Sequence, residues 1–426
     1  MKRNYIMAKE IQTENKSKRF DKAALLIALC WLVYTCSYLG KLGYNANIAK
    51  IEEVYSISHS TAGIVSTFFF FAYGIGQIFN GVFCRKYNIR LVVVVSLFVS
   101  GLMNILVAVS KDFTYVKYLW LTNGVALSIL WPSLIRLLSE TLDSSNIERS
   151  VFAMGTTVVS GTLMVYGLSA LFVAWFSYTV MFFVAGILLP SIAVIWFFAY
   201  PRLTEKPDVQ GESAPRDVAV KSRRSSIFWI SVCALAFFAV VDNLVKDGLI
   251  TWVPMILKEI YALPDYVSIL LTTVLPILAI FGTSVAIALH KKIKDFVYLS
   301  AVLFFVSALL ILLVIICLPS GSVVITLISL GLISCLMSGV NNIITSMTPL
   351  YWKDTVNSGM LAGVLNGFCY LGSTISAYGL GLVADNGGWT SVFILLLSLC
   401  ILAVLLALGY SVTLRLGKAD SQNKRA

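Results

Sequence analysis

Charged residues are scarce in this chain. Only 12% of its 426 residues are Asp, Glu, Lys or Arg, whereas about a quarter of the residues in an average soluble protein are charged. The mean hydropathy of +0.87 and the repeated long apolar runs indicate that lipid is the main solvent of the chain. This composition excludes an ordinary soluble protein and predicts an all-α membrane protein.

Residue types that usually build catalytic or metal sites are also few. The chain has two His and eight Cys, and the Cys show no CxxC spacing. No nucleophile elbow, Walker loop, HExxH motif or paired acidic site occurs. We therefore expect no enzyme activity, no cofactor and no metal, and we interpret the Cys as small apolar side chains packed between helices. The histidines, His59 and His290, lie near the ends of predicted spans, so no histidine relay is expected.

Twelve segments are long and apolar enough to cross a bilayer, which takes about 20 residues per helix. They are residues 23–47, 60–83, 91–110, 114–137, 150–173, 179–199, 227–257, 265–289, 297–317, 322–346, 358–384 and 389–413.

One long polar link divides these segments into two sets of six. It contains Pro201, Pro207, Pro215 and many charges, which is typical of a flexible linker. We predict five parts: a tail at 1–22, a six-helix bundle at 23–200, the linker at 201–226, a second six-helix bundle at 227–413 and a tail at 414–426.

Lys and Arg are distributed unevenly along the chain, whose net charge is +11. With the N-terminus inside, 26 of the 32 fall in inner segments, four in outer segments and two within spans. This asymmetry predicts that both tails and the middle linker are cytoplasmic. The basic surplus then reflects topology and contact with the lipid bilayer rather than nucleic-acid binding. No organelle-targeting signal is evident, which favours a bacterial inner membrane. We also expect a monomer.

The two sets of helices resemble each other weakly. Lys41 corresponds to Lys246 at an offset of 205 residues, and Gly74 corresponds to Gly282 at an offset of 208. Such internal repeats are typical of transporters whose binding site lies between the two halves.

The two lysines within predicted spans are the least expected residues. A charge at the middle of a membrane costs about 3 kcal/mol on insertion scales. Each of Lys41 and Lys246 could extend its ammonium to an interface. Their repeat relationship favours a second interpretation, in which both face a central cavity and bind one anion from opposite sides.

Polar and aromatic residues recur at helical spacing in three spans. Tyr34 and Tyr38 share a helical face with Lys41, and similar pairs occur in the second and eleventh spans. Each tyrosine could equally be a packing residue, and the asparagines could serve hydrogen bonds between helices. The candidate lining residues are Tyr34, Tyr38, Tyr73, Gln77, Trp131, Asn366 and Tyr370.

Asp242 precedes Lys246 by four residues and lies on the same helical face. An ion pair at this spacing would reduce the cost of both charges. Asp242 could alternatively carry a proton during the transport cycle.

Several short motifs resemble those of the major facilitator superfamily. The segment Gly81 to Arg90 is similar to the loop motif of that superfamily, with Cys84 where an acidic residue is usual. More specifically, the chain is similar over nearly its whole length to the organophosphate:phosphate antiporter family, which includes the glycerol-3-phosphate and hexose-phosphate carriers. The motifs of this second resemblance are Tyr34-x3-Tyr38-x2-Lys41, Ala72-Tyr73-Gly74, Trp131-Pro132, Lys246-x-Gly248-x3-Trp252-x-Pro254 and Gly367-x2-Tyr370-Leu371-Gly372.

The resemblance implies a fold of two six-helix bundles and a phosphate site. In that family, arginines in helices 1 and 7 bind the phosphate, and those positions correspond to Lys41 and Lys246. A family lysine corresponds to Gln77, a family histidine falls near Thr157, and a family tyrosine becomes Asn243. The cavity is therefore expected to be less cationic than in the phosphate carriers.

These observations lead to a main hypothesis and two alternatives. The main hypothesis is a secondary transporter that moves a small organic anion by antiport with phosphate or by proton coupling. The preferred substrate under this hypothesis is a phosphorylated sugar or glycerol phosphate. The first alternative is a proton-coupled transporter of a sugar acid or a neutral compound that uses Asp242. The second is a membrane sensor of such a ligand that transports nothing.

Overall fold

The computed structural model describes residues 2–83, 87–204, 226–318, 321–352 and 358–423, and these residues form helices and no strand. Cys84 in the predicted loop motif and most of the predicted linker lie outside the described residues.

The N-terminal half is built from helices that follow one another with short connections. The first helix begins well before the predicted start at residue 23, although its apolar part begins at Lys22. The helices are α1 (Lys2–Ala46), α2 (Ile48–Tyr55), α3 (His59–Phe83), α4 (Ile89–Val109), the 3₁₀ turn η2 (Phe113–Tyr115), α5 (Val116–Ser128), α6 (Leu130–Thr141), α7 (Ser144–Trp175) and α8 (Thr179–Thr204).

The C-terminal half has the same plan with more interruptions. Its helices are α9 (Ser226–Tyr261), α10 (Asp265–Thr272), α11 (Val274–Ala279), α12 (Gly282–His290), α13 (Phe296–Cys317), α14 (Val323–Asn342), the π-helical turn η4 (Ile343–Met347), α15 (Thr348–Tyr351) and α16 (Ser358–Asn423).

Helix α16 crosses the membrane twice. Its apolar part, Met360–Tyr410, has 51 residues, and a straight helix of that length would extend about 76 Å, more than twice the thickness of the hydrocarbon core. The backbone leaves the helical region at Gly388, where φ is 69° and ψ is 177°. Glycine alone adopts this conformation readily. The eleven apolar helices of the described residues therefore make twelve passes, as the sequence predicts.

Proline explains most of the interruptions within spans. A proline lacks the N–H that would bond the carbonyl four residues earlier, and its ring clashes with that carbonyl. The breaks at Ile129 and Thr273 each precede a proline, Pro132 and Pro276 respectively, by three residues.

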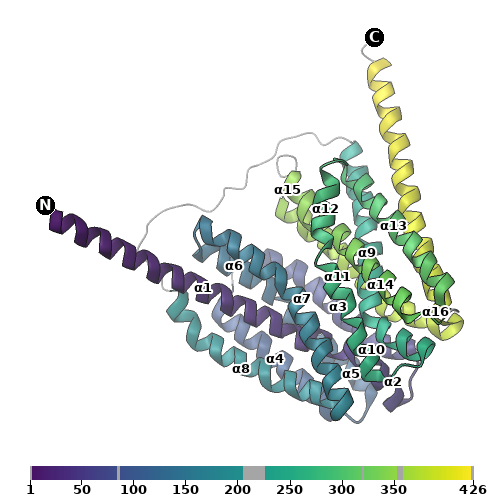
Figure 1. The fold of residues 1–426 in the computed structure, drawn as a ribbon, viewed down its shortest axis with the longest axis horizontal. Helices are drawn as coiled ribbons and strands as arrows, with labels where there is room; N and C mark the ends of the chain where they lie inside the picture. The colour runs from purple at the N-terminus through teal and green to yellow at the C-terminus, as the bar shows by residue number, and fades with distance from the viewer. Residues whose placement is uncertain (1, 84–86, 205–225, 319–320, 353–357, 424–426) are drawn as a thin grey trace.

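The two halves meet at one end and diverge at the other. In Figure 1, α2, α5 and α10 lie near the end where the halves meet, whereas α6, α12 and α15 lie where they diverge. The N-terminal end of α1 and the C-terminal end of α16 point toward the diverging end (Figure 1). We call this end the terminus side and the other the opposite side.

The outer surface is apolar, as a lipid-facing surface must be. Large apolar side chains are exposed on both halves, among them Leu102, Phe198, Leu309 and Leu405. These features establish a multi-pass membrane protein built of two halves.

Candidate functional site

A cavity of about 2640 Å³ separates the two halves. Its lining comes from α1, α3, α4, α6, α7 and α8 in one half and from α9, α11, α12, α14, η4 and α16 in the other. Residues at helix ends on the terminus side line its mouth: Asn88, Arg136, Glu140, Tyr200 and Thr204. The cavity is therefore open toward the terminus side.

The opposite side is closed by direct contact of α3 with α16. A methyl group added at Gly63 would lie 2.2 Å from the carbonyl oxygen of Ala377. The Thr67 hydroxyl donates a hydrogen bond to the carbonyl of Thr374 at 3.0 Å. Backbone contact this close leaves no passage between these helices, so the cavity is accessible from one side only.

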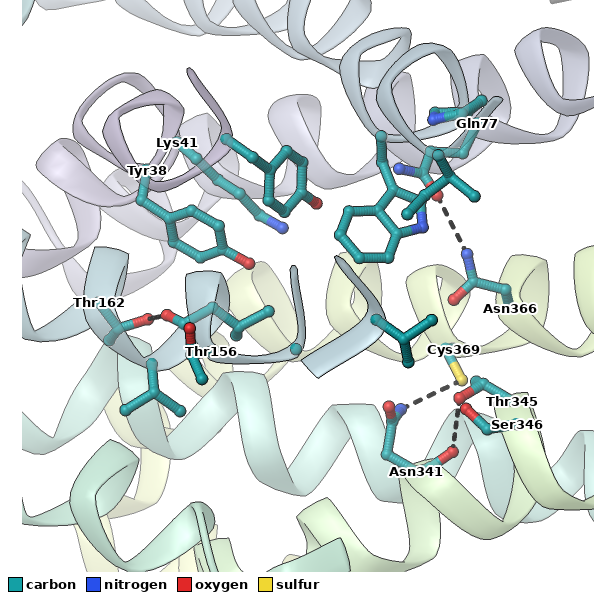
Figure 2. A pocket seen from close by; sticks show the side chains of 18 of the residues that line it. Tyr38, Lys41, Gln77, Thr156, Thr162, Asn341, Thr345, Ser346, Asn366 and Cys369 are labelled. Atoms are coloured by element: carbon teal, nitrogen blue, oxygen red, sulfur yellow. Dashed lines mark hydrogen bonds between the residues drawn. The ribbon is translucent and has the colours of Figure 1, made fainter. Parts of the chain in front are cut away.

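Lys41 lies among three tyrosine rings. Its Nζ is 4.5 Å from the ring centroid of Tyr73, 5.3 Å from that of Tyr38 and 5.6 Å from that of Tyr370. The side chain lines the cavity, as Figure 2 shows, and no ion pair to it occurs among the described residues. Aromatic faces stabilise a cation without neutralising its charge. The ammonium thus remains able to bind an anion that enters the cavity.

A chain of hydrogen bonds extends from this cluster across to the other half. The hydroxyls of Tyr34 and Tyr73 are 3.4 Å apart, and Gln77 Nε2 donates to the Tyr73 hydroxyl at 3.0 Å. Asn366 Nδ2, on α16, donates to Gln77 Oε1 at 3.1 Å (Figure 2). The chain joins the two halves next to the cavity, so relative movement of the halves must break it.

Tyr73 differs from the other predicted lining residues. It is 2% exposed and does not line the cavity. Its ring lies behind Lys41, and its hydroxyl receives the hydrogen bond from Gln77. Tyr73 therefore does not reach the cavity surface in this structure, and its contact with substrate stays a prediction. Its ring contacts the ammonium of Lys41 instead.

Aromatic rings form the wall on the side of the N-terminal half. The Trp131 ring lies 4.7 Å from the ring of Tyr34, and the Tyr34 ring lies 5.8 Å from that of Tyr38. All three residues line the cavity. The Trp131-Pro132 sequence places this indole at the start of α6, directly after the helix break.

Lys246 and Asp247 line the cavity from the C-terminal half. The hydroxyl of Ser373 donates a hydrogen bond to Asp247 Oδ2. No ion pair joins Lys246 to an acidic side chain in the part of the chain that the structure describes. The sequence therefore located both lysines correctly in one cavity, one in each half.

Asp242 lies behind the cavity wall. Its side chain is fully buried, and Oδ2 accepts hydrogen bonds from Asn243 and Asn341, each at 3.2 Å. Its Oδ1 has no hydrogen-bond partner. No ion pair joins Asp242 to Lys246 in this structure, and the asparagine amides bind Oδ2 instead. Asp242 therefore supports the wall rather than lining it.

A π-helical turn in the tenth span was not predicted. It includes residues 343–347, and its residues Thr345 and Ser346 line the cavity with Asn341 (Figure 2). Pro349 follows and cannot donate to the carbonyl of Thr345, so the helix widens there. Such turns are frequent at functional sites. The polar residues of this segment before Pro349 were the available signal: Asn341, Asn342, Thr345, Ser346 and Thr348.

The resemblance places a family histidine near Thr157, but in the structure the preceding residue, Thr156, lines the cavity. Thr157 is fully buried and bonded to the carbonyl of Met154. Thr156 lines the cavity and accepts a hydrogen bond from the indole of Trp31 at 2.9 Å. Asn243, at the position of a family tyrosine, does line the cavity.

Two six-helix halves around a central cavity with one open end define the architecture of a carrier-type membrane protein. The sequence profile of the Major Facilitator Superfamily matches residues 30–360, and the chain belongs to that family.

Two relatives are similar to parts of the chain at low identity. The chain is similar to the membrane sensor protein UhpC of Escherichia coli, with 26% identity over 106 residues, which are 25% of this chain and 24% of that protein. It is also similar to the chloroplastic ascorbate transporter of Arabidopsis thaliana, with 22% identity over 57% of this chain and 47% of that protein. The chain thus matches between about a quarter and a half of the length of these relatives.

Solved structures share the fold. A bacterial homologue of the human lysosomal transporter Spinster, in an inward-facing conformation, has a TM-score of 0.72 and 12% identity, over 92% of this chain and 97% of that chain. At this identity the likeness concerns the fold alone.

Proposed function

We propose that this protein is a secondary transporter of a small organic anion. The observation that carries the proposal is the Lys41 ammonium, which lies in a cavity open to one side, is surrounded by tyrosine rings and has no acidic partner among the described residues. A partly desolvated cation without a counter-charge favours an anionic ligand. Lys246 supplies a second ammonium from the other half.

The charge balance of the cavity favours an anion of single charge over one of double charge. Two ammonium groups and the carboxylate of Asp247 line the central region, and the carboxylate of Asp242 lies directly behind it. Lysine binds anions as a point charge, without the bidentate geometry that arginine offers to phosphate. A sugar acid therefore ranks above a phosphorylated sugar or glycerol phosphate. Hydroxyl and amide groups of Thr345, Ser346 and Asn366 would bind the hydroxyls of either.

Transport would occur by alternating access. In the orientation that the basic residues favour, the terminus side is cytoplasmic and this conformation faces inward. Rocking of the two halves would close the terminus side and separate α3 from α16. A bound anion favours this movement only if it binds the intermediate closed form better. An anion that contacts both Lys41 and Lys246 meets that condition, because the lysines belong to different halves.

Purified protein tests this proposal in two stages. A thermal-shift screen with gluconate, glycerol-3-phosphate and inorganic phosphate should raise the melting temperature with at least one anion, because a ligand that binds the native state stabilises it. That anion should then enter proteoliposomes. Absence of any shift would contradict the anion site.

Asp242 supports proton coupling as the driving reaction. Ionisation of a fully buried carboxylate with one unpartnered oxygen is energetically unfavourable, and protonation removes this cost. In Asp242→Asn, uptake should lose its dependence on a pH gradient while exchange of unlabelled for labelled anion continues. The exposed Asp112→Asn is the matched control. Uptake by Asp242→Asn that still follows the pH gradient would contradict this role.

A sensor is the second candidate, because one relative is named a membrane sensor protein. A sensor should show the thermal shift but no uptake in proteoliposomes. Uptake above that of empty liposomes would refute the sensor.

A further inference from the structure

His59 lies between two carboxylates that belong to different halves. Its Nδ1 is 2.7 Å from Glu52 Oε2, on α2, and its Nε2 is 3.5 Å from Glu259 Oε1, on α9. The imidazole side chain is 17% exposed and that of Glu52 is 6% exposed. The group closes the opposite side of the molecule, away from the cavity mouth.

The remaining groups around His59 come from α16. Asp385 accepts hydrogen bonds from the backbone N–H groups of His59 and Ser60, each at 2.9 Å. Trp389 donates its indole N–H to Glu259 Oε2 at 2.6 Å. The His59 ring centroid lies 5.1 Å from that of Trp389. The nearby lysine on α9, Lys258, is bound to Glu53 and Asp265, and its charge acts on Glu259 only from a distance.

The protonation state of His59 decides whether its position between the carboxylates is favourable. A neutral imidazole has one N–H and one lone pair, so it can donate to one carboxylate only and presents its lone pair to the other. A protonated imidazole donates on both sides and places a positive charge among Glu52, Glu259 and Asp385. Burial raises the pKa of Glu52, and Glu52 Oε1 has no hydrogen-bond partner. Glu52 therefore depends on a positive neighbour to remain ionised.

We propose that His59 is a proton-binding site that holds the opposite side closed, so that loss of its proton releases α2 and α3 from α9 and α16. The inference rests on the alternating access proposed above. Water reaches the site through Glu259, whose side chain is 41% exposed. When the halves separate, Glu259 and Asp385 move away from His59, and the imidazole then binds its proton less tightly. By linkage, a proton bound more tightly in the closed form stabilises that form.

A distance measurement across the opposite side tests the proposal. Spin labels are attached to a ketone amino acid at positions 54 and 266, where Val54 and Tyr266 are exposed on α2 and α10. This chemistry leaves the native cysteines in place. Distances are recorded from about pH 5 to about pH 11, a range that starts below the ordinary pKa of imidazole and extends well above it, because the carboxylate partners hold the proton more tightly in the closed form. We expect the short distance at the acidic end and a growing population of longer distances as pH rises.

Three variants make the result specific. His59→Gln should abolish the pH dependence. His290→Gln, the matched control on the terminus side, should retain it. Glu259→Gln removes one negative partner and should move the transition to lower pH by about 1 pH unit or more. If His59→Gln does not fold, the direction of the Glu259→Gln change decides the question. The proposal is overturned if the wild-type distance does not change with pH, or if His59→Gln retains the pH-dependent change in distance.

A second titration separates this inference from the proposed function. Gluconate and glycerol-3-phosphate are added at constant pH, and the same distance is recorded. A distance that responds to an anion but not to pH overturns the proton site and leaves anion transport standing. A distance that responds to pH but to neither anion supports the proton site and contradicts the anion proposal.

Discussion

Replacement of Lys41 by Gln is the most direct test of the candidate site. The change removes the ammonium and keeps a polar side chain of similar reach. Hydrogen bonds to charged groups contribute about 1.5–3 kcal/mol, and a factor of ten in affinity corresponds to about 1.4 kcal/mol. We therefore expect the dissociation constant of the anion identified in the thermal-shift screen to rise about 10- to 150-fold.

Stability should change far less than affinity. No ion pair to Lys41 occurs among the described residues, so the substitution leaves no carboxylate unpartnered. It removes contacts with three tyrosine rings, the nearest at 4.5 Å, and such a contact contributes about 0.5–1 kcal/mol when exposed and about 2 kcal/mol when desolvated. It also removes a partly buried charge, which offsets much of that loss. The melting temperature without ligand should therefore change by a few degrees at most.

Binding is measured by calorimetry or by ligand-induced thermal shift on the purified protein. Lys41→Arg keeps the charge and should bind within a few-fold of the wild type. Lys111→Gln, at an exposed position on the opposite side, is the matched control and should bind as the wild type does. If Lys41→Gln binds the anion within twofold of the wild type, the anion does not contact Lys41 and the reasoning fails.

Three further outcomes are expected. Gly63→Ala places a methyl group 2.2 Å from a backbone carbonyl of α16, so the opposite side should open. The distance between labels at positions 54 and 266 should then lengthen. The control Gly155→Ala adds a methyl group with nothing within 4 Å and should leave this distance unchanged. Hydrogen bonds from Lys258 and a second lysine lower the pKa of Glu53 from 4.5 to about 2, so the stability that this group contributes is fully present above pH 4.5 and is lost only as pH falls toward 2. Since the Glu53 carboxylate is 51% exposed, Glu53→Gln should lower stability at pH 7 by less than about 1 kcal/mol, and a loss of many degrees in melting temperature at that pH would contradict the assignment. Gly388→Ala forces a positive φ on a residue with a Cβ and should reduce stability by about 1–3 kcal/mol; an unchanged melting temperature would show that the turn adopts another conformation.

Hydropathy predicted the passes well because each bilayer crossing imposes the same length and apolar character. The turn between the last two passes was also predictable, since Gly387-Gly388 interrupts the final apolar run. Interruptions of the helices within spans were harder to predict from the sequence, although Pro132, Pro276 and Pro349 mark three of them. A proline reveals that a helix must adjust, but neighbouring helices decide whether it breaks, kinks or widens.

The candidate site was predicted in part. Lys41, Lys246, Gln77 and Trp131 line the cavity as expected, because an uncompensated polar residue within a span must face protein or water rather than lipid. Tyr73 lies on the helical face that the spacing predicts, but it is buried behind the cavity surface rather than exposed on it. Helical spacing gives the direction of a side chain, whereas its depth depends on which residues of other helices cover it.

The sequence by itself determined the number of passes, the division into two related halves and the position of one lysine in each, because hydropathy, charge and repeat offsets are properties of the chain alone. Only the tertiary structure decided that Asp242 binds Asn341 instead of Lys246, and that His59 meets Glu52 and Glu259. These contacts join side chains from different helices, and sequence spacing specifies which face of a helix a residue occupies but not which partner packs against that face.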